Sequence, residues 1–257
     1  MKNDVSKLFV LAAVVAVMIF AAPADAQRRA SAQVGANCVG GFQALFDEIE
    51  AVPLSAAEIE EITYLREEEK LARDVYLTLA ERWQLPIFSN IAAAEQKHMD
   101  LVYKVIEIYE IEDSITDDTV GAFNNLELQS LYGELVADGE ESLIAALTVG
   151  ATIEDMDLAD LYDLIDVTDN PDVALIAHNL AAGSRNHLRA FVTALGRNGG
   201  SYEAQYLDPD VMASILASDP ERGVVYDELG DVLAECGGPR HRRAGTRGAA
   251  PRPAAWN

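Results

Sequence analysis

Cysteine is almost absent from this sequence, since its 257 residues contain only Cys38 and Cys236, far apart in the chain. Thiolate-ligated zinc and iron–sulfur sites need several cysteines at short spacings. Two isolated thiols therefore argue against a thiolate-ligated metal cluster. In an oxidising compartment the two residues could instead form a disulfide that ties the ends of the folded region together.

Positive charge is also scarce. The chain has 19 Lys and Arg residues against 43 Asp and Glu residues, which gives a formal net charge of −24. A field of this sign repels nucleic acids and anionic membranes, and it attracts cations. We therefore expect no nucleic-acid partner. Most of these carboxylates are expected to form a solvated surface, so acidity alone is weak evidence for metal binding.

Long hydrophobic runs are limited to one, at residues 8–22. Lys2 and Lys7 precede this run, and Ala24-Asp25-Ala26 follows it with the small residues that signal peptidase recognises. The pattern predicts a signal peptide at residues 1–26 and export to the periplasm or the medium. The alternative is an uncleaved membrane anchor. No later run is long enough to cross a bilayer, so we expect no integral membrane segment after cleavage.

Sustained alternation of apolar and polar residues, which is typical of β-strands, is missing as well. Apolar residues instead recur with a helical period in four long segments, which predicts an all-α fold. These segments are residues 55–83, 89–108, 141–165 and 172–195. Ser55 and Glu58 form a capping-box pattern at the start of the first segment. The second helix is expected to begin at Ser89 or Asn90.

Residues 112–140, between the second and third helices, are polar and include a short helical piece near 126–136. Such a long crossover lets the second and third helices run in the same direction, as in four-helix bundles with one crossover connection. A further short helix is expected after Asp208-Pro209. The expected organisation is a lead-in at 27–54, a helical bundle at 55–215, an extension at 216–236 and a disordered basic tail at 237–257.

Each long helix carries an ionisable residue on its apolar stripe, near the middle of the helix. These residues are Glu69 on the first helix, Glu95 and His98 on the second, Glu154 on the third and His187 on the fourth. A buried carboxylate costs several kcal/mol unless it is neutralised or paired. Several of them at matching depth indicate a shared cation, and carboxylate and imidazole ligands suit iron or manganese.

Each of these residues also has a simpler interpretation. Glu69 ends a run of three glutamates that could form a solvated face. Glu95 and His98 could be an ordinary hydrogen-bonded pair, and His187 could be a satisfied core histidine. All four helices, however, carry such a residue on the apolar stripe, and this agreement favours the metal site. The alternative is a metal-free exported helical module for binding or structure, whose inward polar groups form a hydrogen-bonded network.

Two segments resemble known metal-binding helices. Glu69-Lys-Leu-Ala72-Arg73-Asp-Val-Tyr76 and Glu95-Gln-Lys-His98 resemble the first two metal helices of rubrerythrins. Over about residues 55–215 the chain most closely resembles an uncharacterised ferritin-like family, the domain of unknown function 2202. The strings that carry this resemblance are Glu67 to Asp74, Gly150 to Asp155, Gly183 to Phe191 and Gln205-Tyr206-Leu207. The resemblance implies a ferritin-like four-helix bundle and, by superfamily analogy, a di-iron centre, but no particular activity.

The fourth helix departs from that pattern. Di-iron members of the superfamily have Glu-x-x-His there, whereas this chain has Ser184 three residues before His187. Asp157 either replaces the missing carboxylate or is a surface acid. The resemblance also suggests that Tyr76 and Tyr162 hydrogen-bond the metal ligands.

The activity follows less directly from the sequence. A di-iron centre could oxidise Fe(II) with oxygen, reduce peroxide or sequester metal, and whether the chain is an enzyme stays open. It lacks the four cysteines of a rubredoxin-like module, so it has no built-in electron donor of that kind.

His178, on the opposite face of the fourth helix from His187, is expected beside the site or on the surface. Helical periodicity reveals only the core face, so the formation of a homo-oligomer also stays open.

Overall fold

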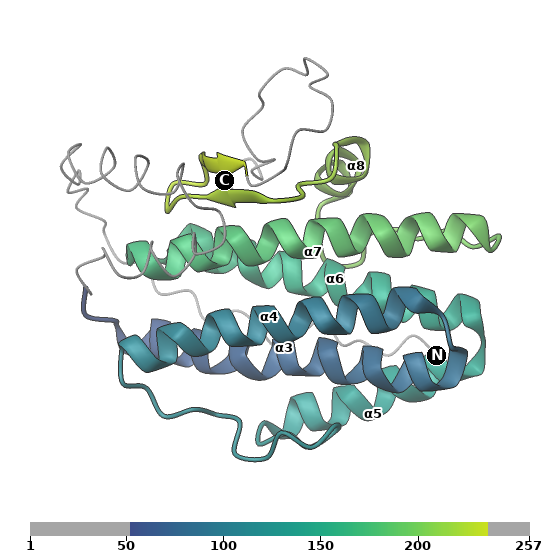
Figure 1. The fold of residues 1–257 in the computed structure, drawn as a ribbon, viewed down its shortest axis with the longest axis horizontal. Coiled ribbons are helices and arrows are strands. Elements are labelled where there is room, and N and C mark those ends of the chain that lie inside the picture. Colours follow the sequence, from purple (N-terminus) through teal and green to yellow (C-terminus); the bar gives the residue numbers. More distant parts are fainter. Residues whose placement is uncertain (1–51, 236–257) are drawn as a thin grey trace.

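The computed structural model describes residues 52–235, in which six helices and two short strands follow one another (Figure 1). The helices are α3 (Ala56–Trp83), α4 (Pro86–Ile108), α5 (Leu126–Glu141), α6 (Leu143–Val167), α7 (Pro171–Arg197) and α8 (Pro209–Ala217). The strands are β1 (Val224–Tyr226) and β2 (Val232–Glu235). The predictions for the signal peptide, most of the lead-in, the cysteine pair and the basic tail lie outside the described residues.

Local capping explains where the helices begin. The Ser55 hydroxyl accepts a hydrogen bond from the Glu58 N–H, and the Glu58 carboxylate accepts one from the Ser55 N–H, so the predicted capping box is confirmed. The predicted start of the second helix at Ser89 or Asn90 is wrong, because α4 already begins at Pro86. Proline suits this position, since the first turn leaves its N–H groups unpaired and proline has none.

The four long helices form two pairs, α3 with α4 and α6 with α7 (Figure 1). α4 also packs against α7, and α3 against α6, so the apolar stripes of all four helices meet in one core. The crossover that contains α5 brings the chain back, so that α4 and α6 run in the same direction. Fully buried core residues include Leu71, Val75, Leu147, Leu158 and Leu188.

Charged residues of α3 hold the start of the crossover against the helices. The Lys70 ammonium group donates to the Asp74 carboxylate (2.5 Å) and to the Thr119 carbonyl (2.9 Å), and Lys70 and Asp74 are fully buried. Arg73 donates to Asp74 (2.9 Å) and to Asp118 in the crossover (2.6 Å). The crossover is therefore attached to the same helix that carries Glu69.

A short hairpin of β1 and β2 packs on α7 and was not predicted from the sequence, because three and four residues are too few to show alternation. Asn179 of α7 bonds both backbone groups of Tyr226, with distances of 2.8 and 3.0 Å. Gly230 lies so close to His178 that a Cβ there would be 2.7 Å from its ring. His178 is therefore buried beneath the hairpin, with an exposed fraction of 8%, which corrects the expectation of a surface position.

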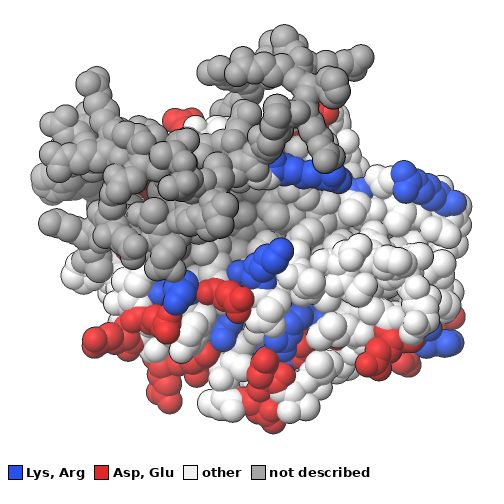
Figure 2. Space-filling model, in the orientation of Figure 1, with Lys and Arg blue, Asp and Glu red and all other residues white. Residues whose placement is uncertain are grey.

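None of the helices within residues 52–235 has both the length and the apolar character that crossing a membrane requires. Figure 2 shows acidic side chains over the lower part of one face, where α3, α5 and the crossover lie in Figure 1. Basic side chains lie among them on this face. The acidic residues visible there are therefore interspersed with Lys and Arg.

Candidate metal centre

Three consecutive glutamates of α3 point in three directions, because each residue turns a helix by about 100°. Glu67, Glu68 and Glu69 are all buried, with exposed fractions of 4%, 2% and 2%. Glu67 accepts hydrogen bonds from the N–H groups of Asn124 and Asn125, at 2.8 and 3.1 Å, and so fixes the start of α5. Glu69 faces α4. The run is therefore not a solvated face.

Glu69, Glu95 and His98 meet between α3 and α4. Nδ1 of His98 lies 3.2 Å from Oε2 of Glu69 and 2.8 Å from Oε2 of Glu95. Both carboxylate side chains are 2% exposed, and that of His98 is 12% exposed. The three-residue spacing places Glu95 and His98 on one face of α4, and Glu69 approaches them from the neighbouring helix.

Glu95 also faces His187, which projects from α7. Oε1 of Glu95 lies 2.9 Å from Nδ1 of His187, yet neither atom has a hydrogen-bond partner of good geometry among the described residues. The rings of His98 and His187 are 5.4 Å apart between centroids and are inclined by 28°. Ligand atoms of Glu95, His98 and His187 all lie within 4.8 Å of one another. The three side chains could therefore hold a metal ion together.

Glu154 of α6 approaches the same ring nitrogen of His187 as Glu95 does. Its Oε2 is 3.4 Å from Nδ1 of His187, and its Oε1 accepts a hydrogen bond of 2.6 Å from the Tyr76 hydroxyl, as expected from the sequence. The matching expectation for Tyr162 is wrong, because its hydroxyl instead accepts a bond of 3.3 Å from Arg185. Eight residues along a helix leave Tyr162 about 80° away from the direction of Glu154.

Asp157 is buried, with an exposed fraction of 6%, one turn after Glu154. Its carboxyl group contacts the Ser184 side chain, and the charges of Glu69 and Glu154 act on it directly. Asp157 is therefore not a surface acid. It lies next to Ser184, the position on α7 at which the superfamily pattern expected from the sequence has a carboxylate.

Burial and neighbouring charges shift the pKa values of these groups. Burial, followed by the charge of Glu95, raises the pKa of Glu154 to about 7. Burial would also raise the pKa of Glu95, but His187 and His98 outweigh it and lower that pKa. Burial lowers the pKa of His187, but Glu95 and Glu154 outweigh it and raise the pKa to about 10. A metal ion would therefore have to displace protons from this cluster.

Buried polar atoms without hydrogen-bond partners test whether the cluster suits a metal. Such atoms are rare in native proteins, because an unpaired buried acceptor costs free energy. Four of those among the described residues belong to this cluster, namely Oε1 of Glu69, Oε1 of Glu95, Oδ1 of Asp157 and Nδ1 of His187. Carboxylate oxygens and imidazole nitrogens are the donor atoms that iron, manganese and zinc bind. The residues therefore fit a metal.

Gly183 of α7 makes room for His98. A Cβ atom at Gly183 would lie 2.3 Å from Nε2 and 2.6 Å from Cε1 of His98. The imidazole ring therefore rests against α7 and keeps its Nδ1 on the side of Glu69 and Glu95. The apolar periodicity does not distinguish this glycine, so the sequence assigned it no role in the site.

We expect Gly183→Ala to displace the His98 ring and to weaken metal binding by about 10- to 100-fold, as other changes that misorient a ligand do. Gly196→Ala is the matched control, because a Cβ added there, on the same helix, meets nothing within 4 Å. Competition with a chromophoric chelator measures both affinities. Equal affinities in the two variants would contradict this role of Gly183.

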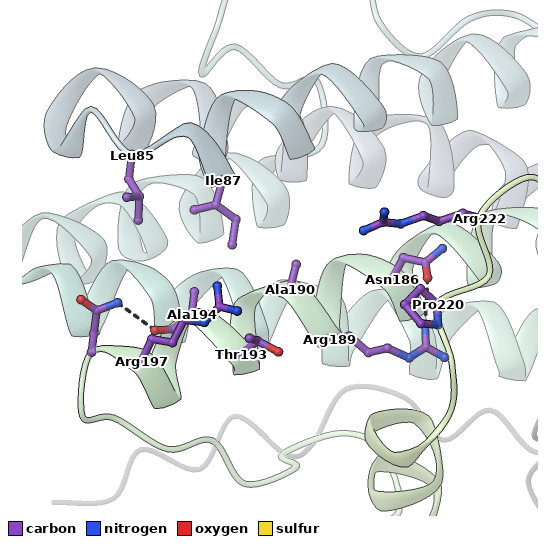
Figure 3. Close-up of a pocket in the computed structure, with 11 residues that line it drawn as sticks. Leu85, Ile87, Asn186, Arg189, Ala190, Thr193, Ala194, Arg197, Pro220 and Arg222 are labelled. Carbon is purple, nitrogen blue, oxygen red and sulfur yellow. Dashed lines mark hydrogen bonds between the residues drawn. The ribbon is translucent and has the colours of Figure 1, made fainter. Parts of the chain in front are cut away.

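Figure 3 shows a surface pocket of ≈470 Å³, and no residue of the cluster lines it. It is lined by Leu85 and Ile87 at the start of α4, by the C-terminal half of α7 and by the segment after α8. Its charged residues are Arg189, Arg197 and Arg222. Arginine side chains do not bind metal cations. The candidate metal centre is therefore an internal site between the helices and not the floor of this pocket.

The model of an uncharacterised protein domain, DUF2202, matches residues 58–219. The chain belongs to the DUF2202 family. Uncharacterised protein MJ0754 of Methanocaldococcus jannaschii is 49% identical over 172 residues, which cover 67% of this chain and 93% of that protein. The crystal structure of hypothetical protein MJ0754 from Methanococcus jannaschii matches with a TM-score of 0.67 and 47% identity. That match covers 67% of this chain and 99% of the other.

The DUF2202 match spans every residue of the candidate metal centre, from Glu69 to His187. It also spans Glu68 and Asp160, two acids beside the centre that the sequence did not indicate. Neither the family description nor the relative names a ligand or an activity.

Proposed function

We propose that this DUF2202 protein is an exported ferritin-like protein that binds two iron ions, with manganese as the alternative metal. The observation that carries the proposal is the position of Glu95. Its Oε2 lies 2.8 Å from His98 and its Oε1 lies 2.9 Å from His187, so that one carboxylate serves two imidazoles. Such sharing suits a carboxylate that bridges two metals.

Each half of the cluster has its own residues. His98 and Glu69 would hold one ion, His187 and Glu154 would hold the other, and Glu95 would bridge them. Asp157 would supply the carboxylate that Ser184 lacks. The arrangement of α3, α4, α6 and α7 in two pairs with a crossover supports the ferritin-like assignment. Export rests on residues 1–26 alone.

Two bound irons would supply redox chemistry with oxygen or peroxide. Within the chain, Tyr76 donates to Glu154 and holds its second oxygen towards His187. Burial of the carboxylates would keep bulk water from the ions. These features support Fe(II) oxidation, peroxide reduction or metal sequestration, and they favour none of the three.

Metal analysis of the purified protein tests the proposal. We expect about two equivalents of iron or manganese per chain, as in di-metal carboxylate bundles. The protein should be purified both with and without air, and Fe(II) and oxygen should then be added while the optical spectrum is recorded. A content below about 0.2 equivalents after both purifications would favour the metal-free network instead.

A further inference from the structure

Glu68 is a buried carboxylate that the candidate metal centre does not use. Its exposed fraction is 2%, and among the described residues neither Oε1 nor Oε2 has a hydrogen-bond partner of good geometry. A buried carboxylate that keeps its charge without a cationic partner is strongly destabilising. A bound cation would remove that cost.

The charges that act most strongly on Glu68 all belong to acids. Its carboxyl group contacts that of Asp160 across the interface of α3 and α6, and the charges of Asp157 and Glu69 act on it from further inside. Asp160 is exposed, whereas Asp157 and Glu69 are buried. The four carboxylates therefore lead from the surface to the candidate metal centre.

The outer end of this line is acidic as well. Glu61 and Asp163 are also exposed, and the charges of Asp160 and Asp163 both act on Glu61. Tyr64, next to Glu68 and Asp160, has its pKa raised by burial and then by these acids. The basic residues of α3 that lie nearby, Lys70 and Arg73, point to the crossover instead. A row of like charges of this sort concentrates cations and speeds their association.

We propose that Asp160 and Glu68 form a transfer site through which divalent cations reach Glu69 and the candidate metal centre. The inference rests on the proposed metal-binding function and adds the route of uptake. Carboxylate oxygens bind and release hydrated divalent ions readily, and among the described residues the strongest charges that act on Glu68 come from acids. Asp157 would receive the ion from Glu68, since its charge acts on Glu68 and the charge of Glu69 acts on Asp157.

Rapid mixing of the metal-free protein with Co(II) tests the route. The growth of visible absorption reports filling of the centre, and the final amplitude reports its capacity. We expect Glu68→Gln and Asp160→Asn each to slow filling by about 10-fold or more, with an unchanged final amplitude. Glu81→Gln is the matched control, because it removes one exposed negative charge near the other end of the same helix.

The outcomes separate the route from the centre. A parent protein that takes up no Co(II) would overturn both the proposed function and the transfer site. A parent that fills, with Glu68→Gln and Asp160→Asn filling equally fast, would overturn the transfer site alone and leave Glu68 and Asp160 as a pair that shares a proton. Should Glu68→Gln fail to fold, Asp160→Asn at the surface still decides between these results.

Discussion

Replacing Glu95 with alanine is expected to abolish metal binding at the centre, with a loss of affinity of at least about 100-fold, or about 2.8 kcal/mol. Glu95 faces both histidines, at 2.8 Å from His98 and 2.9 Å from His187. Its removal leaves two half-sites without a shared ligand. Competition with a chromophoric chelator measures the affinity, and metal content after dialysis measures the stoichiometry.

Glu107→Ala is the matched control for this substitution. Glu107 also lies on α4 and pairs with a basic group three residues away, Lys104, but both side chains are about half exposed, at 45% and 44%. An exposed pair of this kind contributes little. Glu107→Ala should therefore bind metal as the parent does. Equal affinity in Glu95→Ala and Glu107→Ala would show that the centre lies elsewhere.

The same Glu95 variant should lose stability in the metal-free protein, and the loss should depend on pH. The pKa of His187 is raised to about 10 in the folded protein, from its ordinary value of 6.5. A raised histidine pKa contributes stability that is fully present below pH 6.5 and is lost as the pH rises to about 10. The difference in unfolding free energy between the parent and Glu95→Ala should therefore shrink across that window.

Helical periodicity predicted that the candidate ligands meet in the core, because the apolar stripe of a helix indicates which residues face the core. Glu69, Glu95, His98, Glu154 and His187 were placed on four stripes at matching depth, and the structure brings their side chains together. The prediction needed only that four amphipathic helices share one core. It did not require knowledge of which helices are neighbours.

Glu68 shows what periodicity leaves out. It lies one residue off the stripe of Glu69 and is buried only because α6 packs on that side of α3. Whether a helix is also buried on a face beside its apolar stripe depends on which helices pack next to it. This is a property of the tertiary structure. Asp157 was ambiguous in the sequence for the same reason.

The hairpin and its attachments also depend on long-range contacts. Arg185 bonds Glu221, 36 residues later in the chain, through two hydrogen bonds of 2.8 and 2.5 Å. No local pattern indicates a partner at that separation. The string Gly183-Ser184-Arg185 resembles the sequences of a family, but the resemblance does not reveal what each residue contacts.

Replacing Glu221 with alanine is expected to destabilise the protein by about 3–5 kcal/mol, the usual cost of breaking a buried ion pair from one side. Glu221 accepts hydrogen bonds from Arg185, Arg189 and the Tyr226 hydroxyl. The side chains of Arg185 and Glu221 are only 2% and 12% exposed. Without Glu221, the Arg185 guanidinium would stay buried with the Tyr162 hydroxyl, which cannot balance its charge.

The pH dependence distinguishes the ion pair from simple packing. Burial would raise the pKa of Glu221, but Arg185 outweighs it and lowers the pKa from the ordinary value of 4.5. A lowered carboxyl pKa contributes stability that is fully present above pH 4.5 and is lost as the pH falls through the folded value. The difference between the parent and Glu221→Ala, measured by urea unfolding, should therefore be constant near neutral pH and should shrink in acid.

Asp219→Ala is the control, since Asp219 is exposed two residues away and its loss should change stability by less than about 0.5 kcal/mol. Glu221 also contacts residues next to the candidate metal centre. Its N–H donates to Asn186 (2.8 Å), and its carboxylate holds Arg185, the two residues that precede His187 on α7. Metal affinity should therefore fall in Glu221→Ala but stay unchanged in Asp219→Ala. A stable Glu221→Ala protein with full affinity would show that α7 keeps His187 in place without the hairpin segment.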